Sequence, residues 1–176
     1  MKTSTKILVF SDSHGRPDTL RTAIGAHSDA DTVIFLGDGA ADAIEVLDEF
    51  PHVGRCVLAG NCDSRHALSA FGEFLQSEAV LQIGDVRLFC LHGHTRHAKS
   101  GYGALLYAAS EAEADAVLFG HTHIPENEYV PDPGNPARQI LLFNPGSVGL
   151  SHFHTYGILT VEKKKITATH GRALCE

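Results

Sequence analysis

Short apolar runs separated by polar segments recur along most of the chain. Several of these runs are continuously apolar rather than alternating, as expected of strands that are covered on both faces of a sheet. The predicted strands of this kind are Lys6–Phe10, Thr32–Leu36, Arg55–Ala59, Val86–Leu91, Ala116–Phe119 and Gln139–Phe143.

Three segments between these runs have the apolar spacing and the boundary residues of helices. Asp18–Ala26 follows Pro17, a residue favoured at helix starts. Ala41–Phe50 carries its large apolar side chains on one face and is followed by a proline, and Ser100–Ala114 begins with a potential serine cap. The alternation of strands and helices predicts an α/β layered sheet.

The last third of the chain has a different pattern, with pairs of short strands and no helix between them. Glu126–Val130 and Gln139–Phe143 flank a Pro/Gly-rich loop, and Tyr156–Val161 and Ile166–His170 flank a basic turn. Both pairs are typical of β-hairpins. We expect them to complete a second, more antiparallel sheet, so that two sheets pack face to face between flanking helices in a single domain of residues 1–176.

Composition narrows the classes of function. The chain has 176 residues and a formal net charge of -7, with 14 Lys and Arg against 21 Asp and Glu. This balance argues against bulk nucleic-acid binding, which needs clustered basic residues. It is compatible with a small phosphate-containing substrate, because bound metal ions would reverse the local charge.

The cysteines and the N-terminal segment indicate the cellular compartment to expect. Four cysteines occur without a CxxC pair, which argues against a disulfide scaffold. The first apolar run is about five residues long before Ser11 and Asp12, too short for a signal peptide or a membrane span. We therefore expect a cytoplasmic protein without a membrane partner.

Candidate chemistry lies where the predicted strands end. Five runs are followed by polar residues beside a glycine: Ser11-Asp12-Ser13-His14, Gly37-Asp38-Gly39, Gly60-Asn61-Cys62-Asp63, His92-Gly93-His94 and Gly120-His121-Thr122-His123. Ligands collect beyond the carboxyl ends of strands in open α/β sheets. Oxygen and imidazole ligands in this mixture suit Mn, Fe, Ni or Zn better than Ca.

Each of these motifs alone has an ordinary structural explanation. Asp38 could cap a helix, Asp12 could do the same beside a surface histidine, and the segment around Asn61 could be a plain turn. The two histidine pairs are more informative, since two imidazoles within three residues rarely serve packing. The ordered set of five is what indicates a metal site.

In that order, the motifs resemble those of the calcineurin-like metallophosphoesterase superfamily, DxH, GD, GNH(D/E), H and GHxH. The resemblance is closer to its small bacterial and archaeal phosphodiesterase branch, the YfcE-like group, in which the late NPGS motif of Asn144–Ser147 also occurs. It covers the chain from about Ile7 to Val161. It implies a four-layer α/β/β/α sandwich of two mixed sheets.

The resemblance also implies a binuclear centre of two divalent transition metal ions, with manganese as the first expectation and nickel, iron or zinc as alternatives. By motif position, one ion has the ligands Asp12, His14 and His123, the other has Asn61, His92 and His121, and Asp38 bridges them. A hydroxide shared by the two ions would attack phosphorus in line.

One departure from the superfamily pattern affects catalysis. The histidine of GNH(D/E) is replaced by Cys62, and a thiol is a poor substitute for an imidazolium. His94 is the leading replacement, although a histidine that only hydrogen-bonds near the metals is as consistent with the pattern. Asp63 is expected to orient Cys62 or a ligand histidine. Arg96 could reach a phosphate, but an exposed charge is the simpler interpretation.

The sequence therefore predicts a metal-dependent phosphodiesterase that acts on a small phosphodiester, with Asp38, Asn61, Cys62, Asp63 and His94 as candidate catalytic residues. Phosphomonoester hydrolysis at the same site is the nearest alternative. A metal-binding scaffold of the same fold is a weaker one, because all seven ligand positions are filled. A homo-oligomer is expected only by analogy with related enzymes.

Overall fold

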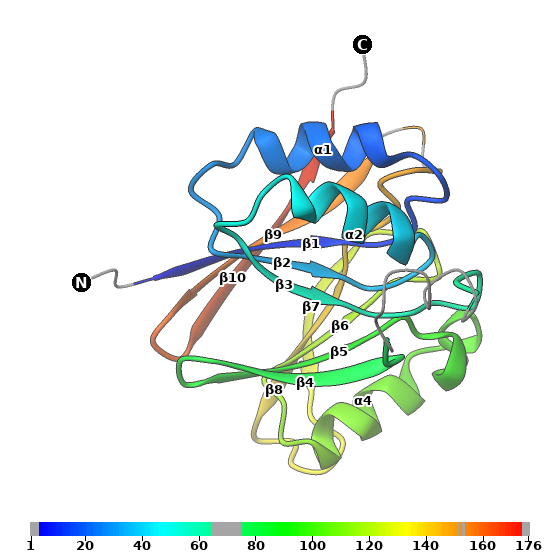
Figure 1. The fold of residues 1–176 in the computed structure, drawn as a ribbon. Helices are drawn as coiled ribbons and strands as arrows, with labels where there is room; N and C mark the ends of the chain where they lie inside the picture. The colour runs from blue at the N-terminus through cyan, green and yellow to red at the C-terminus, as the bar shows by residue number, and fades with distance from the viewer. Residues whose placement is uncertain (1–3, 65–74, 151, 153, 174–176) are drawn as a thin grey trace.

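Two five-stranded sheets form the centre of the molecule (Figure 1). The structure, a computed structural model, describes residues 4–64, 75–150, 152 and 154–173. In the first sheet the strand order is β10-β9-β1-β2-β3, and in the second it is β4-β5-β6-β8-β7. The strands of the first sheet are β1 (Thr5–Phe10), β2 (Thr32–Phe35), β3 (Gly54–Val57), β9 (Thr155–Glu162) and β10 (Lys165–Arg172).

The second sheet is mixed in the same way as the first. It contains β4 (Glu78–Ile83), β5 (Val86–Leu91), β6 (Ala116–Phe119), β7 (Glu126–Pro131) and β8 (Gln139–Asn144). β5, β6 and β8 are parallel, as are β1, β2 and β3, and the remaining pairs are antiparallel. The parallel strands bring the ends of β1, β2 and β3 to one edge, and the ends of β5 and β6 to the corresponding edge of the other sheet.

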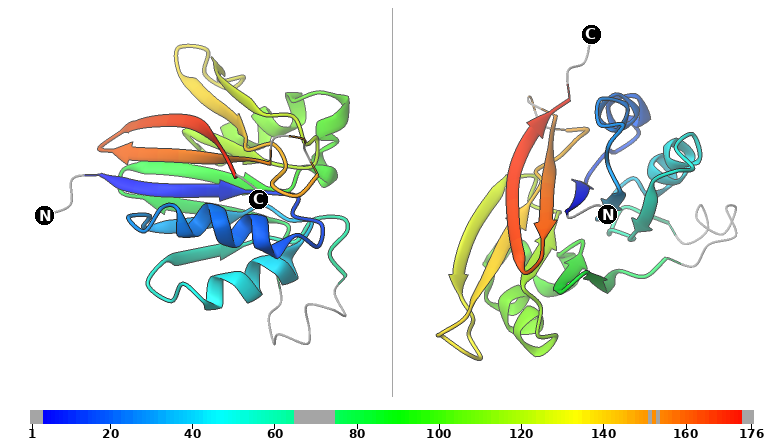
Figure 2. Two further views of the ribbon diagram at one scale, coloured as in Figure 1. Left: turned by 90° about the horizontal axis from the view of Figure 1, so that it is seen from above. Right: turned by 90° about the vertical axis from the view of Figure 1, so that its left-hand side faces the viewer.

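Helices cover the outer faces of the two sheets. α1 (Pro17–Gly25) and α2 (Ala40–Asp48) lie side by side over β1–β3, and α4 (Gly103–Glu111) lies on the second sheet (Figures 1 and 2). Among the described residues, none of the helices is both long and apolar enough to cross a bilayer.

The apolar core has three main parts that match these layers. Side chains such as Ile7, Leu88 and Phe143 fill the space between the sheets. Leu20 and Leu47 are among those packed between α1, α2 and the first sheet, and Leu105 belongs to the cluster under α4. Burial on both faces explains why the central strands are continuously apolar. The predicted α/β/β/α sandwich is confirmed.

Three details differ from the sequence prediction. β4 was not predicted; it is an edge strand whose partly exposed residues leave no continuous apolar run. The two late hairpins do not share a sheet: β7 and β8 join the second sheet, whereas β9 and β10 extend the first. α4 begins at Gly103 without a side-chain cap, because Ser100 belongs to a short 3-10 turn, η2 (Ala98–Ser100).

The β7–β8 and β9–β10 hairpins nevertheless lie side by side (Figure 2). Asn127 donates from its side chain to the carbonyl of Ala168 at 2.8 Å, and the Tyr129 hydroxyl donates to the carbonyl of Ile166 at 2.9 Å. These contacts tie the two sheets together along this side.

Candidate metal centre

The predicted ligand side chains are presented by loops with unusual backbone conformations. Five of the seven lie in the left-handed region, which non-glycine residues rarely adopt. They are Asp12 (φ 59°), His14 (φ 46°), Asp38 (φ 58°), His121 (φ 65°) and His123 (φ 61°). Residues held in sparsely populated conformations cluster at functional sites. Backbone strain thus coincides with the motifs at the strand ends.

Glycines in these motifs allow the strand-end loops to approach one another. A side chain at Gly60 would place its Cβ 2.1 Å from Oδ1 of Asp38. At Gly120 the added Cβ would lie 1.9 Å from the Ser11 Oγ. These distances are far below van der Waals contact, so both positions require glycine. Gly60 allows the loops after β2 and β3 to meet, and Gly120 allows the loops after β1 and β6 to meet.

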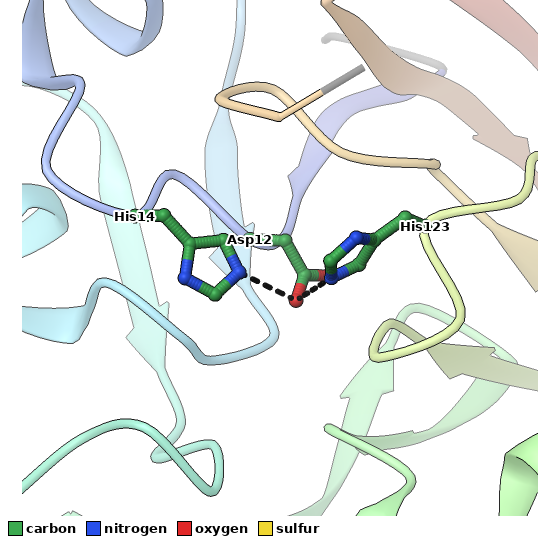
Figure 3. A group of neighbouring side chains, drawn as sticks. All are labelled: Asp12, His14 and His123. Carbon is green, nitrogen blue, oxygen red and sulfur yellow. Dashed lines mark hydrogen bonds and ion pairs between the residues drawn. The ribbon is translucent and has the colours of Figure 1, made fainter.

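Asp12, His14 and His123 form the first group of potential metal ligands (Figure 3). Nε2 of His123 lies 3.1 Å from Oδ1 of Asp12, and Nε2 of His14 lies 3.6 Å from the same oxygen. Asp12 is fully buried, while the two imidazoles are partly exposed. The two histidines approach the carboxylate from opposite sides in Figure 3.

Asp38, His92 and His121 form the second group. Nε2 of His92 lies 3.4 Å from Oδ2 of Asp38, and the rings of His92 and His121 are 5.0 Å apart. The two groups are contiguous, because Nε2 of His14 lies 3.9 Å from Oδ2 of Asp38. Asp38 therefore stands between the two sets of imidazoles.

The state of the ring nitrogens fits a divalent cation. Nε2 of His14 and Nε2 of His92 are buried and have no hydrogen-bond partner among the described residues. Nδ1 of His92 donates to the carbonyl of Leu36 at 3.0 Å, which leaves Nε2 with its lone pair toward Asp38. An imidazole oriented in this way by a carbonyl is a common arrangement of metal ligands. Lone pairs of nitrogen and oxygen facing one another would repel without a cation.

The electrostatics of the second group also favour metal binding. Burial raises the pKa of Asp38, but the neighbouring His92 and the hydrogen bond from the Cys62 backbone outweigh it and hold this pKa below its ordinary value. Burial and the neighbouring His92 lower the pKa of His121 to about 4. His121 is therefore neutral at pH 7, and Asp38 is ionised, which are the forms that bind metals.

In the first group, the electrostatics depend on the close contact between His123 and Asp12. The hydrogen bond to Asp12 raises the pKa of His123 from its ordinary value, against the opposing effect of burial. The carboxylate thus attracts positive charge in this position, as a cation site requires.

Asn61 and Cys62 lie on the exposed side of the centre. The Asn61 amide donates to the Cys62 sulfur at 3.2 Å, and the Cys62 backbone N–H donates to Oδ1 of Asp38 at 2.7 Å. The thiol, His14 and Asp38 form a third close group. A hydrogen bond to Asp38, with burial, raises the pKa of Cys62 to about 11, so the thiol is protonated at neutral pH.

The Asp63 carboxylate binds the backbone of two loops. Within the described residues, its carboxylate accepts hydrogen bonds from four backbone N–H groups: Asp38 at 2.8 Å, Gly39 at 2.9 Å, Ala40 at 2.9 Å and Gly60 at 2.8 Å. Asp63 therefore holds the turn that carries Asp38, and joins it to the loop after β3, instead of orienting a ligand histidine.

His94 lies in a 3-10 turn, η1 (His94–Arg96), beside the second group. Its ring is 5.4 Å from that of His92 and 6.2 Å from that of His121, and its buried Nδ1 has no partner among the described residues. Burial and the neighbouring His92 lower its pKa. Arg96 does not face this centre freely, because it forms two hydrogen bonds of 2.9 Å with Glu78.

Three residues behind the site support the ligand loops. Ser147 donates to the carbonyl of Asp12 at 2.8 Å, and Asn144 donates to the carbonyl of Gly120 at 3.0 Å. His170 in turn donates to the Asn144 carbonyl at 2.7 Å. The Asn144–Ser147 motif thus supports the loops after β1 and β6, whereas nothing in the sequence around His170 distinguishes it.

Comparisons with known proteins agree with the fold and the motifs. A model of the calcineurin-like phosphoesterase superfamily domain matches residues 5–171. The probable metallophosphoesterase YsnB of Bacillus subtilis is 32% identical over 165 residues, which cover 92% of this chain and 87% of that protein. Phosphodiesterase YfcE of Escherichia coli K12 is 29% identical over 189 residues, which cover 96% and 95%.

Solved structures show the same fold. A conserved protein of Streptococcus pneumoniae TIGR4, described as a predicted phosphoesterase, superposes with a TM-score of 0.76 over 98% of this chain and 92% of that chain. Its sequence identity is 22%, so this likeness concerns the fold alone.

Proposed function

Because the chain belongs to the calcineurin-like phosphoesterase superfamily and is a metal-dependent phosphoesterase, we propose that it hydrolyses a small phosphodiester at a centre of two metal ions. The observation that carries this proposal is the contiguous cluster of two ligand groups around Asp38, with the unpartnered Nε2 atoms of His14 and His92 inside it. The preference for diesters rests on the similarity to phosphodiesterase YfcE.

In this proposal each ion has three ligands of its own and shares Asp38. One ion would be held by Asp12, His14 and His123, and the other by Asn61, His92 and His121. Two such ions supply positive charge for the phosphate oxygens and a hydroxide nucleophile at neutral pH. Manganese remains the first expectation for their identity.

The remaining chemistry falls to the protein side chains. Without bound metal the pKa of Cys62 is raised to about 11, so the thiol is neutral, and a thiol is a poorer proton donor than an imidazolium. His94 is an imidazole outside the seven ligand positions, and its ring lies next to those of His92 and His121. We assign to it the hydrogen bond to the leaving oxygen of the substrate. Asp63 fixes the turn of Asp38 and does not contact the substrate.

Metal analysis combined with rate measurements tests this function. The purified protein, loaded with Mn or Ni, is assayed on bis(p-nitrophenyl) phosphate and p-nitrophenyl phosphate. Faster hydrolysis of the diester is expected; equal or faster hydrolysis of the monoester would assign the site to monoesters. A metal-loaded protein that hydrolyses neither would favour a scaffold of the same fold.

Two variants test the assigned roles. Asp38→Asn should abolish activity and reduce the bound metal, whereas Asp85→Asn, at an exposed turn far from the site, should change neither. His94→Ala should lower kcat while leaving the metal content intact, and His52→Ala serves as its exposed control. Unchanged turnover in Asp38→Asn would refute the bridging role.

We further expect residues 1–176 to act as one domain in the cytoplasm. Association into a homo-oligomer is a prediction by analogy, which sedimentation of the metal-loaded protein would test.

A further inference from the structure

A cavity of about 340 Å³ lies beside the first ligand group, between the β1–α1 loop and the β8–β9 loop. Arg16 lines it from the first loop, and Gly149, Leu150, His152 and His154 line it from the second. Its volume is at the lower end of the range for small-molecule sites, about 300–1,000 Å³.

The wall of this cavity is attached directly to a predicted metal ligand. The backbone N–H of Gly149 donates to the Asp12 carbonyl at 3.1 Å, next to the bond from Ser147 to the same oxygen. A side chain at Gly149 would place its Cβ 1.9 Å from the carbonyl oxygen of Ser13, so the two loops are in close contact. In Figure 3 the β8–β9 loop passes above the segment that carries Asp12. The Gly149 side of the cavity is therefore attached to the loop that carries Asp12.

The lining side chains suit an organic anion. Arg16 is exposed and makes no side-chain hydrogen bond or ion pair with another described residue. His154 donates from Nδ1 to the Val148 carbonyl at 2.9 Å, which leaves its Nε2 available. Leu150 is 55% exposed, a large apolar surface at the rim. None of the described lining residues is a carboxylate, although the chain as a whole carries a net charge of -7.

We propose that this cavity binds the part of the substrate beyond the scissile phosphate, and that the substrate is an organic phosphodiester bearing a second phosphate group. Arg16 binds the second phosphate, because a guanidinium forms paired hydrogen bonds with phosphate oxygens. Leu150 packs against the organic moiety. That the reacting group is a phosphodiester rests on the proposed function. The binding of the second phosphate by Arg16 does not rest on it.

A matched pair of chromogenic substrates tests the proposal. Thymidine 5′-(p-nitrophenyl phosphate) and the same compound with a 3′-phosphate share the scissile bond and differ by one phosphate. We expect kcat/KM to be about tenfold higher for the compound with the 3′-phosphate, as one charge-assisted contact provides. Arg16→Gln should remove this preference, so that the compounds with and without the 3′-phosphate give kcat/KM values equal within about threefold.

A charge-matched control separates local binding from the overall charge. Lys165→Gln also removes one positive charge, but Lys165 begins β10, near the N-terminal end of β1 and away from the Asp12 end. This variant should keep the preference. Equal rates on the two compounds in the wild type, or a preference that survives Arg16→Gln, would overturn the assignment.

A binding measurement keeps the outcome independent of catalysis. Calorimetry with thymidine 3′,5′-bisphosphate and thymidine 5′-monophosphate, with and without added manganese, should show tighter binding of the bisphosphate that Arg16→Gln abolishes. If neither diester is hydrolysed, the proposed function is wrong. The calorimetric comparison of the two nucleotides would still test whether the cavity binds a second phosphate. Equal affinities for the two nucleotides would reject it.

Discussion

The substitution Asp63→Asn tests whether the candidate metal centre depends on a carboxylate whose described hydrogen bonds all go to backbone N–H groups. Oδ1 of Asp63 accepts from the N–H groups of Gly39 and Ala40, and Oδ2 accepts from those of Asp38 and Gly60. The amide keeps one oxygen and turns an NH₂ group toward two of the four N–H donors. Two hydrogen bonds are then lost, and the remaining two no longer involve a charge.

The expected loss of stability is substantial. A hydrogen bond to a charged group contributes about 1.5–3 kcal/mol, but Asp63 is half-buried, and water compensates part of this loss. We therefore expect Asp63→Asn to lower the free energy of unfolding by about 2–4 kcal/mol. For a domain of this size, that corresponds to a fall in Tm of roughly 5–15 °C.

The metal centre should weaken together with the fold. Asp38 has a left-handed backbone, and Asp63 is the side chain that binds its N–H, so a looser turn displaces the bridging carboxylate. Loss of such a supporting contact typically reduces metal affinity about 10–100-fold. Calorimetric unfolding and manganese titration measure the two effects, with Asp85→Asn as an exposed control.

A variant Asp63→Asn that melts within about 1–2 °C of the wild type would show that the four N–H groups do not depend on the charged carboxylate. A large fall in Tm with unchanged manganese affinity would show that Asp63 contributes to the stability of the fold but does not hold Asp38 in position for metal binding.

Gly60→Ala should lower both the Tm and the bound metal, since its Cβ would lie 2.1 Å from Oδ1 of Asp38; Gly25→Ala, with nothing within 4 Å, should be neutral or stabilising by calorimetry. In the metal-free protein, Cys62 should react with iodoacetamide at pH 8 roughly 100-fold more slowly than an ordinary thiol, because its pKa is raised to about 11; rapid loss of the thiol, absent in Cys62→Ser, would contradict this. Burial and Lys6 lower the pKa of His27 below 6.5, so the folded state favours the neutral ring, and stability present above pH 6.5 is lost as the pH falls toward the lowered pKa. Urea unfolding of His27→Gln should therefore show a smaller loss of stability between pH 7.5 and pH 5.5 than the wild type; an equal loss would assign the effect to other groups.

The location of the candidate ligands at the strand ends could be predicted from the sequence because two signals coincide there. A continuous apolar run predicts a strand buried on both faces, and a polar residue at its end is predicted to lie at one edge of a parallel sheet. His92 after β5 and His121 after β6 satisfy both conditions, as do the three ligand motifs of the first sheet. Each strand could therefore be interpreted without knowledge of its partners.

Features that depend on contacts between distant backbones could not be predicted in this way. β4 has alternating partial exposure at a sheet edge, so its pattern resembles a loop as much as a strand. The late hairpins could be predicted as pairs, but the sheet that each joins depends on the packing of whole layers. The partners of Asp63 are N–H groups, which every residue except proline carries, so no residue type in the sequence identifies them.

The backbone around the candidate ligands is strained and is held by hydrogen bonds. Five ligand residues have left-handed conformations, each of which costs on the order of 1 kcal/mol for a non-glycine residue. Such conformations persist because other contacts impose them: Asp12 donates from its N–H to the Gly37 carbonyl at 2.9 Å and accepts from Ser147, while Asp63 binds the N–H of Asp38. These hydrogen bonds fix the backbone of the loops that carry the candidate ligand side chains. The folded protein keeps this strain because the surrounding core and the contacts of Asp63, Asn144 and Ser147 exceed its cost, which explains why the supporting residues lie outside the ligand motifs or at their margins.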